Sequence, residues 1–297
     1  MKKYIFTFIS ILFIGSSLYL GKEIYNKMDT FKRYKQSVAS ELNLQTTVTN
    51  ISNYISSNSF ETKKQEAQRK IKKANAVKSK ANYLSLLFLV GILIYSGLTY
   101  FFFRIKSIEI KHIGYAVLNI SFVLLLFGIF IPILELGIFM QDLTIDLKIY
   151  SKTFDGKMYF LYQCKSLVGV IKILFQNHNF GVGIAILLFS VIFPFTKLGI
   201  FYMYLFTDKL NTKTRILNIV SYIGKYSMAD VFVVATFLAF FSFSNMSMGA
   251  KTESTTLVGL YFFTGYCILS IATYFVIEKK MKETKEIKSV TSLDDLI

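Results

Sequence analysis

The stretch G-V-G-I-A-I-L-L-F-S-V-I-F-P-F-T-K-L-G-I-F-Y-M-Y-L-F, Gly181 to Phe206, carries a single charged side chain, Lys197. About 20 consecutive apolar residues in an α-helix cross the roughly 30 Å of hydrocarbon in a bilayer. The stretch is therefore predicted to be a transmembrane helix. A charge at that depth costs about 3 kcal/mol, so Lys197 should face the protein interior, water or a partner.

Composition extends this prediction to the whole chain. Hydrophobic residues make up 53% of the 297 positions and charged residues 18%, whereas a soluble domain has fewer apolar residues and more charge. The expected fold is an all-α polytopic membrane protein with about six transmembrane helices. The five further predicted spans are Tyr4–Leu20, Asn82–Phe103, Ile113–Met140, Tyr226–Met248 and Thr256–Ile277.

The first apolar stretch allows two interpretations. It is short, follows Met1, Lys2 and Lys3, and ends near small residues at positions 15–17, which is typical of a cleaved signal peptide. The apolar run continues through residues 18–20, past the possible cleavage point, which favours an uncleaved signal anchor. We assign residues 1–20 to this anchor, as a first transmembrane helix.

Basic residues indicate the orientation of the chain, because Lys and Arg in short loops usually face the cytoplasm. Basic clusters at 104–111, 209–215 and 279–282 share one side of the membrane if both termini are cytoplasmic. The basic residues between Lys63 and Lys80 would then face outward, which opposes the assignment. Their loop is about 60 residues long, near the length at which charge stops controlling translocation.

The loop at 21–81 is predicted to form an extracytoplasmic helical hairpin. It has no proline, and its apolar residues recur at helical spacings up to Ile55, where a Ser/Asn run intervenes. This hairpin and a second span with its basic loop, 82–111, complete an N-terminal span–helical hairpin–span unit. The loop is strongly basic, so it is either a solvated spacer or a docking surface for anionic lipid or an acidic partner.

The segment after the third span is predicted to be mixed. Asp142, Asp146, Lys148 and Tyr150 alternate in the manner of a short strand region. Ser166–Phe175, S-L-V-G-V-I-K-I-L-F, is apolar but too short to span a bilayer. It is predicted to be an amphipathic or re-entrant helix on the outer face.

A second polar motif, Y-S-M-A-D-V-F, places Asp230 a few residues inside the span that starts at Tyr226. One interpretation is local: Ser227 caps the helix and Asp230 occupies its N3 position, a contribution of about 1 kcal/mol. Lys197 has its own local explanation, snorkelling to the interface. The functional interpretation is a Lys197–Asp230 pair at similar depth, which would line a polar route for lipid headgroups or relay protons.

Two further residues complete the predicted polar core, also interpreted as the lipid path. Pro194 has no N–H, so the Ser190 carbonyl one turn earlier loses its helical partner, which marks a packed or wet site. Glu135 follows Pro132 near the outer end of the third span. It is either an outer-mouth counterpart of the pair or, as we favour, an interfacial charge.

Other classes of function find little support. The net charge of +16 comes from residues between apolar spans, which argues against nucleic-acid binding. Cys164 and Cys267 form no C-x-x-C pair, and His112 and His178 flank spans at the interface, so we expect no metal and no cofactor. No catalytic set is recognisable, and we expect no enzyme. Five glycines are predicted to allow close helix packing: Gly181, Gly183, Gly199, Gly259 and Gly265.

These motifs resemble the paraquat-inducible protein A (PqiA) family, which includes the LetA-type lipid transport proteins. The similar residues are P-I-L at Pro132–Leu134, F-P-F-T-K-L at Phe193–Leu198, K-Y-S-M-A-D-V-F at Lys225–Phe232 and G-L-Y-F-F at Gly259–Phe263. The resemblance covers about Ile113 to Ile277. Each motif is weak alone, but their order, spacing and placement on four spans are fairly specific.

The resemblance implies a C-terminal four-helix, tetraspanin-like membrane domain at 112–278, followed by a cytoplasmic tail at 279–297. It also implies the bacterial inner membrane, a phospholipid or related lipid as cargo, and a periplasmic mammalian-cell-entry (MCE) domain partner that forms a lipid tunnel. The family's polar core positions match Pro194, Lys197, Ser227 and Asp230. Better-known members fuse two such domains and carry zinc ribbons, whereas this chain has one domain and no C-x-x-C pair.

Three functions follow from these observations. The first is an inner-membrane component of an envelope lipid-trafficking system. The second is a non-transporting membrane adaptor or sensor that uses the extracytoplasmic hairpin. The third is an ion- or proton-coupled transporter of small molecules.

Overall fold

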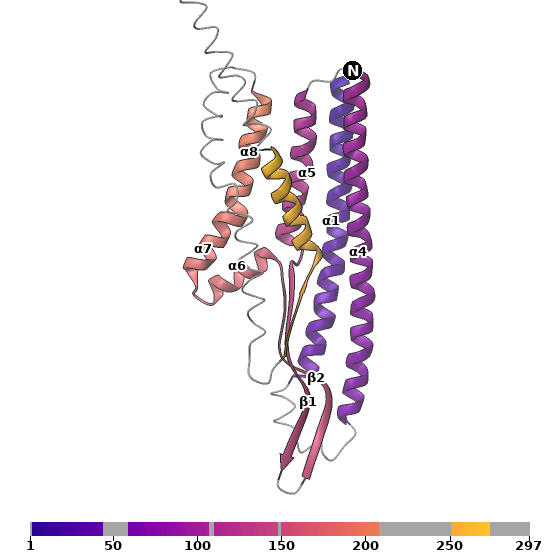
Figure 1. The fold of residues 1–297 in the computed structure, drawn as a ribbon, viewed down its shortest axis with the longest axis vertical. Coiled ribbons are helices and arrows are strands. Elements are labelled where there is room, and N and C mark those ends of the chain that lie inside the picture. Colours follow the sequence, from indigo (N-terminus) through magenta and orange to yellow (C-terminus); the bar gives the residue numbers. More distant parts are fainter. Residues whose placement is uncertain (1, 44–58, 107–109, 148–149, 208–250, 274–297) are drawn as a thin grey trace, which may run out of the picture.

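The computed structural model describes residues 2–43, 59–106, 110–147, 150–207 and 251–273. Within these ranges the fold is mostly helical, as predicted, with one small sheet near the lower end of the helices (Figure 1). Four helical segments there are long and apolar enough to cross a membrane: Tyr4–Glu41, Thr62–Phe102, His112–Phe130 and Phe180–Phe206. The predicted fifth span, Tyr226–Met248, lies outside the described ranges, and the sixth corresponds to a shorter apolar helix, Val258–Thr273.

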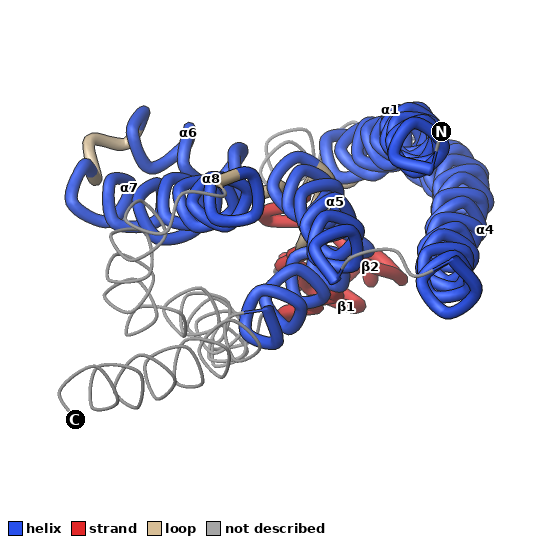
Figure 2. The backbone as a smooth tube through the Cα atoms, turned by 90° about the horizontal axis from the view of Figure 1, so that it is seen from above, coloured by secondary structure: helices blue, strands red, loops and turns tan. Residues whose placement is uncertain are grey.

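The two longest helices pack along each other. Helix α1 spans Lys2–Glu41 and α4 spans Ser59–Lys106, and they run antiparallel at one side of the molecule (Figures 1 and 2). Stacked rings of Phe13 and Tyr95, with centroids 4.1 Å apart, join their apolar ends. An ion pair between Glu41 and Lys70 joins their polar ends. Each helix therefore continues from a predicted span into the predicted hairpin without a break.

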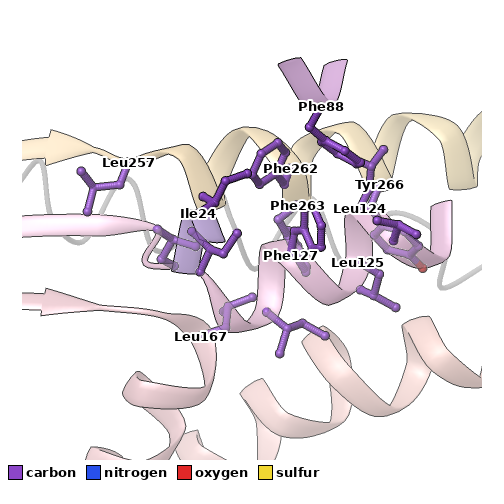
Figure 3. Close-up of a cluster of buried hydrophobic side chains, with 14 of the residues drawn as sticks. Ile24, Phe88, Leu124, Leu125, Phe127, Leu167, Leu257, Phe262, Phe263 and Tyr266 are labelled. Carbon is purple, nitrogen blue, oxygen red and sulfur yellow. The ribbon is translucent and has the colours of Figure 1, made fainter. Parts of the chain in front are cut away.

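Helix α5, Ile110–Phe130, forms the centre of the described core. Its Phe127 ring lies 4.8 Å from Phe88 of α4 and 5.5 Å from Phe262 of the helix Val258–Thr273 (Figure 3). The helix ends ten residues before the predicted end of the third span at Met140. Pro132 explains the difference, because it lacks an N–H and forces the preceding residue out of the helical conformation.

A three-stranded antiparallel sheet follows α5, in the order β2-β1-β3. Its strands are β1, Leu134–Leu147, β2, Tyr150–Lys165, and β3, Lys251–Thr256. The end of α1 is attached to this sheet, because the Tyr159 N–H donates to the Leu42 carbonyl at 2.9 Å. The strand region predicted from Asp142 to Tyr150 is therefore part of a longer sheet, of which the all-α fold class gave no account.

The chain then forms a helical hairpin, in which a short helix is followed by a longer helical segment. Ser166 caps α6, Leu167–Gln176, by accepting a hydrogen bond from the Gly169 N–H at 3.2 Å, so this helix lies where the sequence placed it. Next come α7, Phe180–Leu187, a π-helical turn η1, Leu188–Ile192, and α8, Phe193–Phe206. Together these three segments form the span predicted at Gly181–Phe206, and α8 packs against α5.

Candidate functional site

The predicted polar core begins with Lys197, which the structure buries within the protein. Only 4% of this residue is exposed, and its neighbours Leu198 and Phe201 on α8 are buried as well. A lysine that snorkels keeps its ammonium group in water. The Lys197 side chain instead lies inside the protein, one turn after the buried Pro194.

Pro194 changes the helix around it. Because proline has no N–H, the α-helical ladder cannot continue through it, and the turn before it widens to the π-helical η1, where the Phe193 N–H donates to the Leu188 carbonyl. The Thr196 hydroxyl donates to the Ile192 carbonyl at 2.8 Å. The Ser190 hydroxyl in this turn is fully buried and has no hydrogen-bond partner among the described residues. Such π turns are frequent at functional sites in helices.

The second half of the predicted core lies outside the described residues. Ser227 and Asp230 fall in the range 208–250, so the predicted Lys197–Asp230 pair stays a prediction.

A buried polar chain, absent from the sequence predictions, crosses the apolar part of the bundle. The Tyr202 hydroxyl of α8 donates to the Asn119 side chain of α5 at 2.7 Å, and the Asn119 amide donates to the Tyr95 hydroxyl of α4 at 3.2 Å. Tyr95 and Ser10 of α1 share a hydrogen bond of 2.9 Å. Four helices are thus joined by side chains that would otherwise be unsatisfied in hydrocarbon.

Glu135 occupies a second polar centre, which we call the Glu135 junction: Glu135 on β1, Lys35 on α1, Lys78 on α4, Tyr162 on β2 and Thr255 on β3. The carboxylate is 3.1 Å from the Lys35 ammonium and 3.5 Å from that of Lys78. The Tyr162 and Thr255 hydroxyls donate to its two oxygens at 3.1 and 3.0 Å. At 8% exposure this is a buried junction of both long helices with all three strands, rather than an interfacial charge.

The aromatic ring of Phe31 completes the junction. It is fully buried, and the Lys35 and Lys78 ammonium groups lie 5.8 and 5.3 Å from its centroid. Both cations therefore contact the same carboxylate and the same ring.

The electrostatics of the junction favour the ionised carboxylate. Burial by itself raises the pKa of Glu135, but the two ammonium groups and the Thr255 hydroxyl lower it, and the balance holds the pKa below its ordinary value of 4.5. Burial and the adjacent carboxylate raise the pKa of the Tyr162 hydroxyl well above its usual range, so it stays a donor. The junction is therefore built for a negative charge on Glu135 at neutral pH.

Acid should weaken this junction. A carboxyl whose pKa is lower in the folded than in the unfolded state stabilises the fold above about pH 4.5, and this contribution is lost as the pH falls through the lower folded value. We expect the stability of the wild type to fall below pH 4.5 more steeply than that of Glu135→Gln, when unfolding of both in detergent is followed against pH. Parallel pH profiles of the two proteins would contradict this assignment.

Part of the buried polar chain could have been recognised from the sequence, but the Glu135 junction could not. Asn119 and Ser121 are polar residues inside α5, an otherwise apolar helix, and such residues tend to face other helices. No comparable signal connected Glu135 to Lys35 and Lys78, because those lysines lie in a basic stretch where many cations look alike. Which lysines contact Glu135 depends on how α1 and α4 pack against the sheet.

Fold and sites together define a polytopic helical membrane protein whose helices carry a small sheet near one end. Residues 156–281 match the sequence model of the PqiA family, described as paraquat-inducible protein A. This part of the chain is thus PqiA-like, and it includes α6, α7 and α8 with Pro194 and Lys197. It begins later than the resemblance seen in the sequence and excludes the P-I-L motif at Pro132–Leu134. No curated protein and no solved structure matched the chain.

Proposed function

We propose that this protein is the inner-membrane component of a bacterial envelope lipid-trafficking system. It passes a phospholipid or related lipid to or from an MCE-type periplasmic tunnel partner, without a catalytic step of its own. Both termini are cytoplasmic in this proposal, so that the hairpin of α1 and α4 and the sheet face the periplasm. The similarity to the PqiA family over residues 156–281 supports the proposed role in envelope lipid trafficking.

The observation that carries the proposal is the burial of Lys197 beside the Pro194 break, in a helix long enough to cross a membrane. A charge at that depth is expensive unless polar groups or water surround it. The widened turn and the buried Ser190 hydroxyl add polar groups to the same place. A lipid headgroup needs such a polar environment to leave the membrane surface.

The test is Lys197→Met in a bacterial strain whose outer-membrane integrity depends on this protein. We expect integrity to be lost while the protein still reaches the membrane and unfolds at a similar temperature, because methionine fills the volume without the charge. Lys197→Arg retains the charge and should retain part of the function. Lys73→Met, at an exposed position of α4, is the matched control and should have no effect. Normal integrity with Lys197→Met would remove the proposed mechanism.

A membrane adaptor or sensor is the second candidate function. The observation that favours it is the Glu135 junction, which fastens the hairpin to the sheet and makes them one continuous unit. An adaptor should tolerate Lys197→Met but lose partner binding with Glu135→Gln. A transporter should instead lose its function with Lys197→Met. The two variants in one strain therefore separate these functions.

A further inference from the structure

A pocket of about 310 Å³ lies apart from Lys197, where α1, the end of β2 and the start of α6 meet. Three lysines line it: Lys32 from α1, Lys165 from the last position of β2 and Lys172 from α6. Residues more than a hundred positions apart in the sequence thus bring positive charge to one concave surface.

The charge of this pocket is incompletely balanced by its own residues. Among the lining residues that the structure describes, Asp29 is the one carboxylate, and it already forms an ion pair with Arg33 at 2.9 Å. Burial and the positive charge of Lys32 lower the pKa of Lys165, as expected where ammonium groups approach each other. Cys164, also in the lining, stays neutral because burial raises its pKa to about 12. An anion in the pocket would relieve this repulsion.

The start of α6 adds to the positive potential. Ser166 and Gly169, the two residues of its N-terminal cap, both line the pocket. A helix N-terminus carries a partial positive charge and presents backbone N–H groups, which favours phosphate and carboxylate ligands. The lysines and the N-terminus of α6 therefore attract an anion into the same pocket.

The position of the pocket along the molecule indicates where the anion comes from. Phe130, the last residue of α5, and Pro132 form part of the lining, so the pocket lies at the level where this transmembrane helix ends. The polar headgroups of a bilayer begin where its hydrocarbon ends. Ile173 of α6 adds an apolar side chain to the same wall. An anion with an attached acyl region suits this surface better than a small soluble ion does.

We propose that this pocket binds the phosphate of an anionic phospholipid headgroup at the membrane surface. The ammonium groups of Lys165 and Lys172 contact the phosphate oxygens, with Lys32 and the N-terminus of α6 adding to the attraction. This site goes beyond the proposed transport function and does not require it, because a lipid bound here can equally serve as a fixed part of the protein.

The test measures binding of short-chain dihexanoyl phosphatidylglycerol to the full chain purified in a zwitterionic detergent. Each lysine near a membrane surface contributes about 1 kcal/mol toward an anionic lipid, so K165Q/K172Q should bind about thirtyfold more weakly than the wild type. K72Q/K73Q removes the same charge from exposed positions of α4 and should bind within about twofold of the wild type. Equal affinity of the two double variants would overturn the site.

Two further ligands identify the source of the phosphate. Dihexanoyl phosphatidylcholine carries a compensating cation and should bind at least about tenfold more weakly than phosphatidylglycerol. Inorganic phosphate should compete only at much higher concentration. If inorganic phosphate binds as tightly as the lipid, the pocket takes a soluble anion and the lipid assignment is wrong. Since binding is measured without transport, a failure here is distinct from a failure of the Lys197→Met experiment.

Discussion

Glu135→Gln is expected to lower the free energy of unfolding by about 3 kcal/mol, as breaking a buried ion pair from one side does. Glutamine keeps the shape of the side chain, and its single amide oxygen can accept from either Tyr162 or Thr255, while the other hydroxyl can turn to accept from the amide NH2. What it removes is the charge that Lys35 and Lys78 share. Their side chains are only 19% and 28% exposed, so water replaces the lost partner poorly. Equilibrium unfolding in mixed micelles, read out by proteolysis of the unfolded state, measures the change.

A matched control lies on the adjacent strand of the same sheet. Glu253 on β3 pairs with Lys157 at 2.6 Å, but these side chains are 55% and 45% exposed. Glu253→Gln should therefore cost less than about 1 kcal/mol. A second comparison adds Lys35→Met to Glu135→Gln, which should recover part of the loss because one uncompensated cation is removed. Equal losses for Glu135→Gln and Glu253→Gln would mean that the junction does not stabilise the fold.

Gly259→Ala is expected to destabilise the protein by about 2 kcal/mol, because the added methyl group would collide with backbone. A Cβ at Gly259 would lie 2.4 Å from the Ile131 carbonyl oxygen and 2.6 Å from that of Pro132. Neither atom belongs to a side chain that can turn away. The Gly259 N–H also donates to the Pro132 carbonyl at 3.1 Å, and this bond would lengthen as the helix Val258–Thr273 moved outward.

Gly265→Ala, on the same helix, is the control for this substitution and should not destabilise the protein. Its Cβ would meet Leu124 at 3.6 Å, an ordinary contact. Alanine inside a helix is favoured over glycine by about 0.5–1 kcal/mol, so the variant should be as stable as the wild type or slightly more so. Mixed-micelle unfolding of both variants measures the difference. Destabilisation of the same size at both positions would show that the close backbone carbonyls at Gly259 are not the cause of the loss.

The transmembrane segments could be predicted from the sequence because length and apolar composition determine them almost alone. Gly181–Phe206 corresponds to α7, η1 and α8, and Ser166 caps α6 where the apolar stretch begins. The third span was predicted too long because L-E-L-G-I-F-M suits both an apolar helix and a buried strand. Only Pro132, just before it, indicated the boundary.

The candidate sites were harder to predict than the spans. Lys197 and Pro194 are buried, but the predicted polar core stays a prediction because Ser227 and Asp230 lie outside the described residues. The role of Glu135 could not be deduced, because its partners come from α1 and α4, more than fifty residues away along the chain. The glycine prediction holds at Gly259, whereas a Cβ at Gly181 or Gly199 would meet nothing within 4 Å in the described structure.

The length of α1 and α4 has a mechanical consequence. Their 40 and 48 residues extend about 60 and 72 Å at 1.5 Å per residue, twice the roughly 30 Å of hydrocarbon that either must cross. About half of each helix therefore extends beyond a bilayer that the helix crosses. Because the Glu135 junction fastens this part of both helices to the sheet, the hairpin and the sheet would move together, and a tilt of about 10° over about 30 Å would displace the far end by about 5 Å.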